Sequence, residues 1–255
     1  MSQWLHGLDL PLVWAVIIAF GVLMYVVMDG FDLGVGILFP FLKDRHDRDR
    51  MMNSIAPVWD GNETWLVLGG AGLFGAFPLA YAVILPALYL PLSLMLIALI
   101  FRGVAFEFRF KARTSRGLWD VAFAAGSTVA AFTQGVALGA FVQGITVVGR
   151  SFAGGPFDWL TPFTIMTGLG LVAGYAMLGC GWLIMKTEDR LQDRFFRLMT
   201  PLGGIVLCFI GAVSLWTPFH SPAIADRWFT WPNIAYLSPV PILVAITALA
   251  LVAAL

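Results

Sequence analysis

The stretch "LVWAVIIAFGVLMYVVMDGFDLGVG", residues 12–36, is long and apolar enough to cross a bilayer, yet it carries two aspartates near its end. It belongs to an apolar run over residues 8–40, and a membrane-spanning helix needs ~20 residues. A carboxylate facing hydrocarbon costs about 2.5–3.5 kcal/mol even on insertion scales. We therefore expect Asp29 and Asp32 to face the interior of a helix bundle or a hydrated path.

The rest of the chain repeats this pattern. Hydrophobic residues make up 60% of the sequence and charged residues only 12%, which excludes an ordinary aqueous globular domain. Further apolar runs cover residues 54–76, 79–101, 118–148, 159–185, 198–217 and 234–255. The runs are continuous rather than alternating, which disfavours a membrane β-barrel. We predict an all-α fold, a polytopic membrane helical bundle of seven spans in a single transmembrane domain over residues 1–255.

The basic residues predict the orientation of the bundle. Thirteen of the fifteen Lys and Arg residues fall in the segments 43–50, 102–116 and 186–197, which are alternate connections in the seven-span arrangement. The positive-inside rule places these connections in the cytoplasm and the N-terminus on the periplasmic side. The first ten residues lack Lys and Arg, so we expect a mature start rather than a signal peptide. The sequence ends inside an apolar run, so either a final helix is missing or the chain stops abruptly.

Two acidic pairs lie at comparable depths in the first two spans. Asp29 and Asp32, and likewise Asp60 and Glu63, are three residues apart, which puts each pair on one helix face. The spans are joined by a short charged connection and must run antiparallel, so the pairs could face one another. Two close carboxylates in a medium of low dielectric constant do not readily both ionise, and one tends to hold a proton. The four residues are candidates for a proton relay, and the structural alternative is protonated carboxyls that hydrogen bond neighbouring helices.

Other side chains limit the chemistry. The three histidines, His6, His46 and His220, lie outside the middle of any predicted span, so we expect no haem and no metal bound by this chain. There is no basic block with interleaved aromatic residues, which argues against nucleic acid as a partner. The segment "RGVAFEFRFKAR" places Arg102 and Glu107 at the cytoplasmic end of the third span. Either this segment is a solvated interfacial cluster, or it is an entry point for protons or a partner subunit.

Three motifs carry a family resemblance. "DGFDLGVG" in the first span, "NSIAPVWDGNETWL" in the second and "FRGVAFEFR" at the third occur in this order. Together they resemble subunit II of cytochrome bd-type quinol oxidases, including the cyanide-insensitive branch. The resemblance implies a respiratory complex of the bacterial inner membrane that oxidises quinol and reduces oxygen. In that family haem b and haem d lie in subunit I, subunit II carries no haem, some members hold a quinone in subunit II, and a small accessory subunit can be present.

The resemblance also implies roles for particular residues. It assigns Asp29, Asp32, Asp60 and Glu63 to the conduction of cytoplasmic protons toward the oxygen-reducing haem, although some relatives carry an amide in place of Glu63. The lower-ranked candidates for the subunit interface or for proton entry are Trp59, Asn62, Arg102 and Glu107. The family usually has eight spans in two four-helix groups. Residues 1–148 would then form the first group, and residues 149–255 would form an incomplete second group.

Two functions from other classes stay open. Intramembrane carboxylates also serve proton-coupled transporters, although the later spans offer no matching second pair. A purely structural subunit that stabilises a haem-bearing partner and conducts no protons is the third possibility. Copurification with haem absorbance and quinol-dependent oxygen uptake would separate an oxidase subunit from a transporter.

Overall fold

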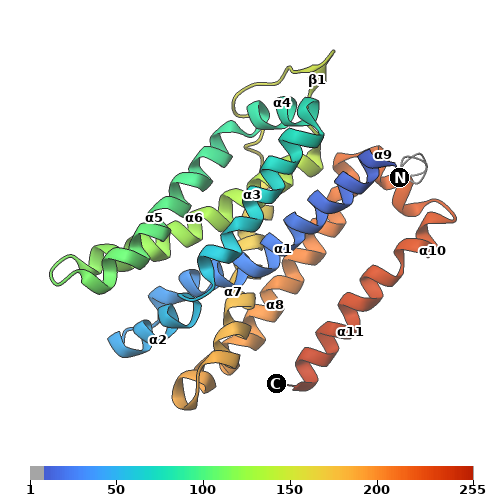
Figure 1. Ribbon diagram of the computed structural model, residues 1–255. Coiled ribbons are helices and arrows are strands. Elements are labelled where there is room, and N and C mark those ends of the chain that lie inside the picture. Colours follow the sequence, from blue (N-terminus) through green and yellow to red (C-terminus); the bar gives the residue numbers. More distant parts are fainter. Residues whose placement is uncertain (1–8, 255) are drawn as a thin grey trace, which may run out of the picture.

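The computed structural model describes residues 9–254 and consists mainly of long antiparallel helices (Figure 1). The first half contains, in chain order, α1 (Leu10–Leu38), the 3-10 helix η2 (Phe39–Phe41), α2 (Arg45–Ile55), α3 (Trp59–Ala76), α4 (Pro78–Ala87), α5 (Tyr89–Lys111) and α6 (Arg116–Gln143). The second half contains the short strands β1 (Val147–Val148) and β2 (Ser151–Phe152), followed by α7 (Pro162–Lys186), α8 (Asp189–His220), α9 (Pro222–Phe229), α10 (Asn233–Leu237) and α11 (Pro239–Ala254).

The predicted all-α membrane bundle is confirmed. Within residues 9–254, six helical segments are long and apolar enough to cross a membrane. They are α1, α5, α6, α7, α8 and the segment Asn233–Leu251, which contains α10 and most of α11. The second expected span is present as α3, but its first two turns contain Asp60, Asn62 and Glu63. These polar residues lower its apolar character, so six rather than the expected seven segments qualify by length and composition.

The third span was placed too early by the sequence. The apolar run expected at residues 79–101 is divided into the short helix α4 and the longer helix α5, with the break at Leu88. Pro91 has no N–H to continue a helical ladder from α4, so the chain turns before it and α5 begins with Tyr89. As a result α5 extends to Lys111 and contains Arg102 and Arg109, which both become buried.

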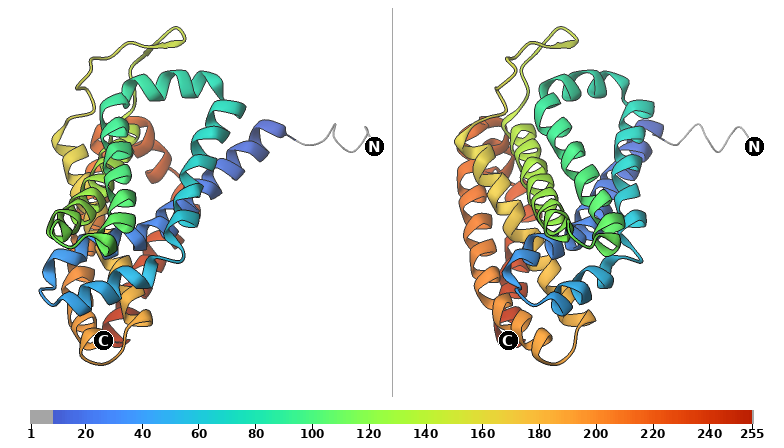
Figure 2. Two further views of the ribbon diagram at one scale, coloured as in Figure 1. Left: turned by 60° about the vertical axis from the view of Figure 1, so that its left-hand side comes forward. Right: turned by 90° about the vertical axis from the view of Figure 1, so that its left-hand side faces the viewer.

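The basic connections gather at one end of the bundle. Helix α2, the α5–α6 turn and the α7–α8 turn lie at this end, whereas α4, α9 and the β1–β2 hairpin lie at the other (Figure 1). The antiparallel hairpin projects beyond the helix ends (Figure 2). This arrangement agrees with the positive-inside expectation that the three connections share one side of the membrane.

Helices α1 and α7 cross in close contact through glycines. A Cβ atom at Gly34 would overlap the backbone carbonyl of Tyr175, and one at Gly179 would overlap the backbone of Gly34. Small residues let membrane helices approach until their backbones are in contact. In lipid the hydrophobic effect does not drive helices together, so van der Waals packing at such contacts stabilises the pair. The crossing draws the last third of α1, from Asp29 to Leu38, into the interior of the bundle, where every residue is buried.

Candidate functional site

A cluster of charged side chains lies inside the bundle where α1, α3 and α5 meet. Asp29, Asp32 and Arg102 are each fully buried. Arg102 Nη1 lies 3.2 Å from Asp29 Oδ1 and 3.6 Å from Glu63 Oε2. One guanidinium therefore forms ion pairs with two carboxylates that come from different helices.

Asp32 joins the cluster through an amide. The Asn62 side chain donates a hydrogen bond from Nδ2 to Asp32 Oδ2 over 2.8 Å, and Asn62 is itself buried. The facing of the first two spans, expected from their acidic pairs, is confirmed for Asp29, Asp32 and Glu63. Asp60 differs, because it is exposed in the first turn of α3, and within residues 9–254 its carboxylate makes no salt bridge or hydrogen bond.

Aromatic side chains cover the cation of the cluster. The Arg102 guanidinium lies 5.8 Å from the ring centroids of both Trp59 and Phe106, and these two rings are stacked with their centroids 4.8 Å apart. Contacts with aromatic rings at this distance stabilise a desolvated guanidinium. Trp59, a lower-ranked candidate from the sequence, thus contacts the cluster directly.

The cluster has more acidic than basic groups. It holds the three carboxyl groups of Asp29, Asp32 and Glu63 against one guanidinium, so it becomes electrically neutral only when two carboxyl groups carry protons. Within the described residues, both oxygens of Asp29 and all three guanidinium nitrogens of Arg102 lack a hydrogen bond of ordinary geometry. The cluster therefore keeps the capacity to bind protons and to hydrogen bond further polar groups.

Glu63 connects the buried cluster with the surface of the chain. Its side chain is 26% exposed, in contrast to the fully buried Asp29 and Arg102. Asp60 lies one helical turn before Glu63 and is exposed. A series of carboxyl groups thus runs from the exposed first turn of α3 to the interior of the bundle.

Arg102 and Glu107 correct a prediction from the sequence. Both were expected at the cytoplasmic end of the third span, either in a solvated charge cluster or at an entry point for protons or a partner subunit. Arg102 is instead buried in the membrane-spanning part of α5. Glu107 is exposed and pairs with Lys111 over 3.2 Å, one turn later on the same helix. Only Arg102 belongs to the carboxylate cluster, because α5 lies later in the chain than the expected span and so places the Arg102 side chain between Asp29 of α1 and Glu63 of α3.

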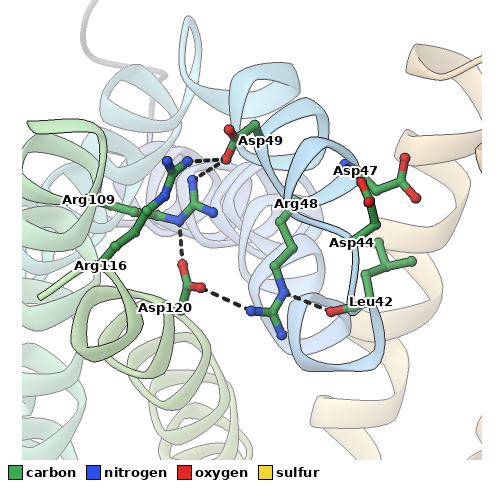
Figure 3. Close-up of polar contacts among 8 residues, drawn as sticks. All are labelled: Leu42, Asp44, Asp47, Arg48, Asp49, Arg109, Arg116 and Asp120. Atoms are coloured by element: carbon green, nitrogen blue, oxygen red, sulfur yellow. Dashed lines mark hydrogen bonds and ion pairs between the residues drawn. The ribbon is translucent and has the colours of Figure 1, made fainter. Parts of the chain in front are cut away.

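A second charged network lies at the end of the bundle that holds α2 (Figure 3). Arg109 of α5, whose side chain is fully buried, donates from Nη1 to Asp49 over 2.7 Å and from Nε to Asp120. Arg116 also pairs with Asp49, and Arg48 donates to Asp120 over 3.0 Å. The network ties α2 to α5 and α6.

The sequence did not reveal this second network, because its charges resemble a solvated connection. Partial burial alone would raise the pKa of Asp49, but the hydrogen bonds from Arg109 and Arg116 outweigh this effect and hold the pKa below its usual range. The alternation of acidic and basic residues at 44–50 was the available signal. This alternation predicts ion pairs only when a segment of complementary charge is known to lie beside residues 44–50.

An aromatic layer separates the two networks. Phe106 lies on α5 between Arg102 and Arg109, and its ring packs edge-on against Phe123, which packs edge-on against Phe39. The Arg109 guanidinium lies 5.2 Å from the ring centroid of Phe39. These three rings carry no ionisable group, so they form an apolar boundary between the Arg109 network and the carboxylate cluster.

Comparison with known proteins assigns the family. The model of the family described as cytochrome bd terminal oxidase subunit II matches residues 10–255. The chain belongs to the cytochrome bd subunit II family. The resemblance predicted from the three sequence motifs is thereby confirmed.

Individual relatives of the cytochrome bd subunit II family agree with this assignment. The chain is 34% identical to the "Probable cytochrome oxidase subunit 2" of Haemophilus influenzae, over 77% of this chain and 54% of the relative. It is 36% identical to the cytochrome bd-I ubiquinol oxidase subunit 2 of Escherichia coli K12, over 72% and 51%, respectively. It is 28% identical to the cytochrome bd ubiquinol oxidase subunit 2 of Bacillus subtilis, over 84% and 64%. The chain spans about half the length of the first two relatives.

Proposed function

We propose that this chain acts as subunit II of a cytochrome bd-type quinol oxidase in the bacterial inner membrane. It would stabilise a haem-bearing subunit I and help conduct cytoplasmic protons toward the oxygen-reducing haem of that partner. The observation that carries the proposal is the buried cluster of three carboxyl groups around Arg102, which reaches the surface at Glu63. Family membership makes an oxidase complex the setting for this cluster.

The order of the carboxyl groups supports a direction of transfer. Asp60 is the exposed group, Glu63 is partly exposed, and Asp29 and Asp32 are buried. A proton taken up at Asp60 could pass to Glu63 and then to Asp29 or Asp32, with water filling the steps that exceed hydrogen-bonding distance. Arg102 would limit the cost of the negative charge left behind at each step.

The histidines support a haem site in the partner rather than in this chain. Of the two in the described residues, His46 is exposed on α2 and His220 is exposed in the last turn of α8. A haem inside the bundle would need axial ligands among the buried residues, and neither histidine is placed to supply one. These residues therefore do not fit a haem, and we propose that haem b and haem d are bound by subunit I.

Substitution of carboxyl groups in the purified complex tests the proposal. Asp29→Asn and Asp32→Asn keep side-chain size but remove the proton-binding group, so oxygen reduction should fall at least about tenfold, or about 1.4 kcal/mol on the limiting barrier. Glu63→Gln should have a milder effect, because the family resemblance implies that an amide is accepted at this position. Glu107→Gln is the matched control, because Glu107 is exposed and outside the cluster.

Haem content and subunit association are measured on the same preparations. Normal haem with slow turnover supports a relay in this chain. Parental turnover in all the amide variants would exclude the relay, and loss of haem with loss of association would indicate that the carboxyl groups serve packing alone.

A further inference from the structure

A hydrogen-bonded chain of three side chains crosses the bundle next to Asp29. It links Tyr25 of α1, Gln134 of α6 and Tyr175 of α7, and both tyrosines are buried. Gln134 Nε2 donates to the Tyr25 hydroxyl oxygen over 2.6 Å, and the Tyr175 hydroxyl donates to Gln134 Oε1 over 2.9 Å. Every link therefore points in one direction, from Tyr175 toward Tyr25.

This direction leaves the hydroxyl proton of Tyr25 free to be donated. The Tyr25 oxygen accepts from Gln134, and Tyr25 lies one turn before Asp29 on the same face of α1. Asp29 is fully buried, and neither of its oxygens has a hydrogen bond of ordinary geometry within residues 9–254. A buried acceptor that needs a donor thus lies next to a donor that is not otherwise used.

Gly30, the residue after Asp29, allows the Tyr175 ring to pack directly against α1. A Cβ atom at residue 30 would lie 2.8 Å from Cε1 of the Tyr175 ring. Only glycine lets the ring pack this closely against α1. The residue that follows Asp29 in the sequence therefore permits the far end of the chain to reach Gln134.

We propose that Tyr25, held by Gln134 and Tyr175, is a positioning residue that donates a hydrogen bond to Asp29. This hydrogen bond sets the pH range over which Asp29 accepts and releases protons. The inference rests on the proposed relay function and adds to it. The Gln134 amide neither gains nor loses a proton in the physiological range, so the chain orients Asp29 rather than conducting protons itself. The titratable and charged groups that face Asp29 come from four helices: Tyr25 and Asp32 of α1, Glu63 of α3, Arg102 of α5 and Tyr175 of α7.

The test uses the purified complex with Tyr25→Phe, Gln134→Met and the double variant. Tyr25→Phe removes only the hydroxyl group. Because the charged carboxylate loses a donor, the pH of half-maximal oxygen reduction should move upward by about one unit. Gln134→Met should move it in the same direction by less, and it should add nothing in the Tyr25→Phe background, because Gln134 acts through Tyr25. Tyr81→Phe is the matched control, since Tyr81 of α4 contacts Phe74 away from the cluster.

Infrared difference spectra recorded over a range of pH give a second measurement. A loss of packing alone would leave the carboxyl stretching band of Asp29 unchanged. The carboxyl stretching band that disappears in Asp29→Asn should change frequency in Tyr25→Phe, with haem content and the KM for quinol unchanged. An unchanged band and an unchanged pH profile in Tyr25→Phe would overturn the inference, as would a double variant whose shift is the sum of the two. Parental turnover in all the amide variants of the relay would instead refute the relay, and the band frequency would still decide whether Tyr25 donates to Asp29.

Discussion

The stability of the chain should fall far less when one of the two carboxylates next to Arg102 is removed than when both are removed. The Arg102 Nη1 atom lies 3.2 Å from Asp29 and 3.6 Å from Glu63. At an effective dielectric constant of about 20, the attraction of unit charges at either distance is about 5 kcal/mol before desolvation is subtracted. The two attractions are nearly equal, so each carboxylate can neutralise the buried guanidinium when the other is absent.

The expected changes in the free energy of unfolding follow from this redundancy. Asp29→Asn or Glu63→Gln alone should cost about 1 kcal/mol, because one counterion remains. The double variant leaves the buried guanidinium without a carboxylate in ion-pair contact and should cost about 3 kcal/mol or more. The double-mutant cycle should therefore show a coupling of about 1 kcal/mol or more.

Denaturant unfolding of the full chain in mixed micelles, followed by circular dichroism, measures these differences. Glu107→Gln serves as the control, because it also removes one carboxylate from a salt bridge but at an exposed position. It should leave unfolding unchanged. The redundancy would be refuted if the double variant cost the sum of the single variants within about 0.5 kcal/mol, or if either single variant already cost as much as the double.

Two further predictions concern the second charged network, around Asp49, and the crossing of α1 and α7. Because the pKa of Asp49 is lowered in the folded chain, its contribution to stability is present above the unfolded value of about 3.9 and is lost as the pH falls through the folded value. Hydrogen exchange of α2, corrected for intrinsic rates, should therefore speed up below about pH 4 in the parent and lose this dependence in Asp49→Asn; equal profiles would contradict the pairing. Gly34→Ala should destabilise the chain by about 1–3 kcal/mol or more in the same unfolding assay, because the new methyl group meets the α7 backbone. Gly70→Ala, where no atom lies within 4 Å, should be neutral or stabilising, and a similar loss at both positions would show that the helix crossing is not the cause.

Much of the site could be predicted from the first two spans. The short connection around residues 43–50 forces α1 and α3 to run antiparallel, and the i, i+3 spacing of the acidic pairs puts each pair on one face. These two facts were enough to bring Asp29 and Asp32 toward Glu63. They could not show that Asp60 turns to the surface of the chain while Asn62 turns inward to Asp32.

The sequence by itself determined the fold class, the order of the helices and the end at which the basic connections gather. These properties follow from the lengths of apolar runs and from the positions of charges along the chain, and both are local. The tertiary structure decided which charges are buried. Hydropathy could not locate the break at Leu88, so it placed Arg102 at a membrane surface. A buried guanidinium is stable only where carboxylates from other helices offset its desolvation. The tertiary structure brings Asp29 of α1 and Glu63 of α3 to 3.2 Å and 3.6 Å from the guanidinium that Arg102 extends from α5.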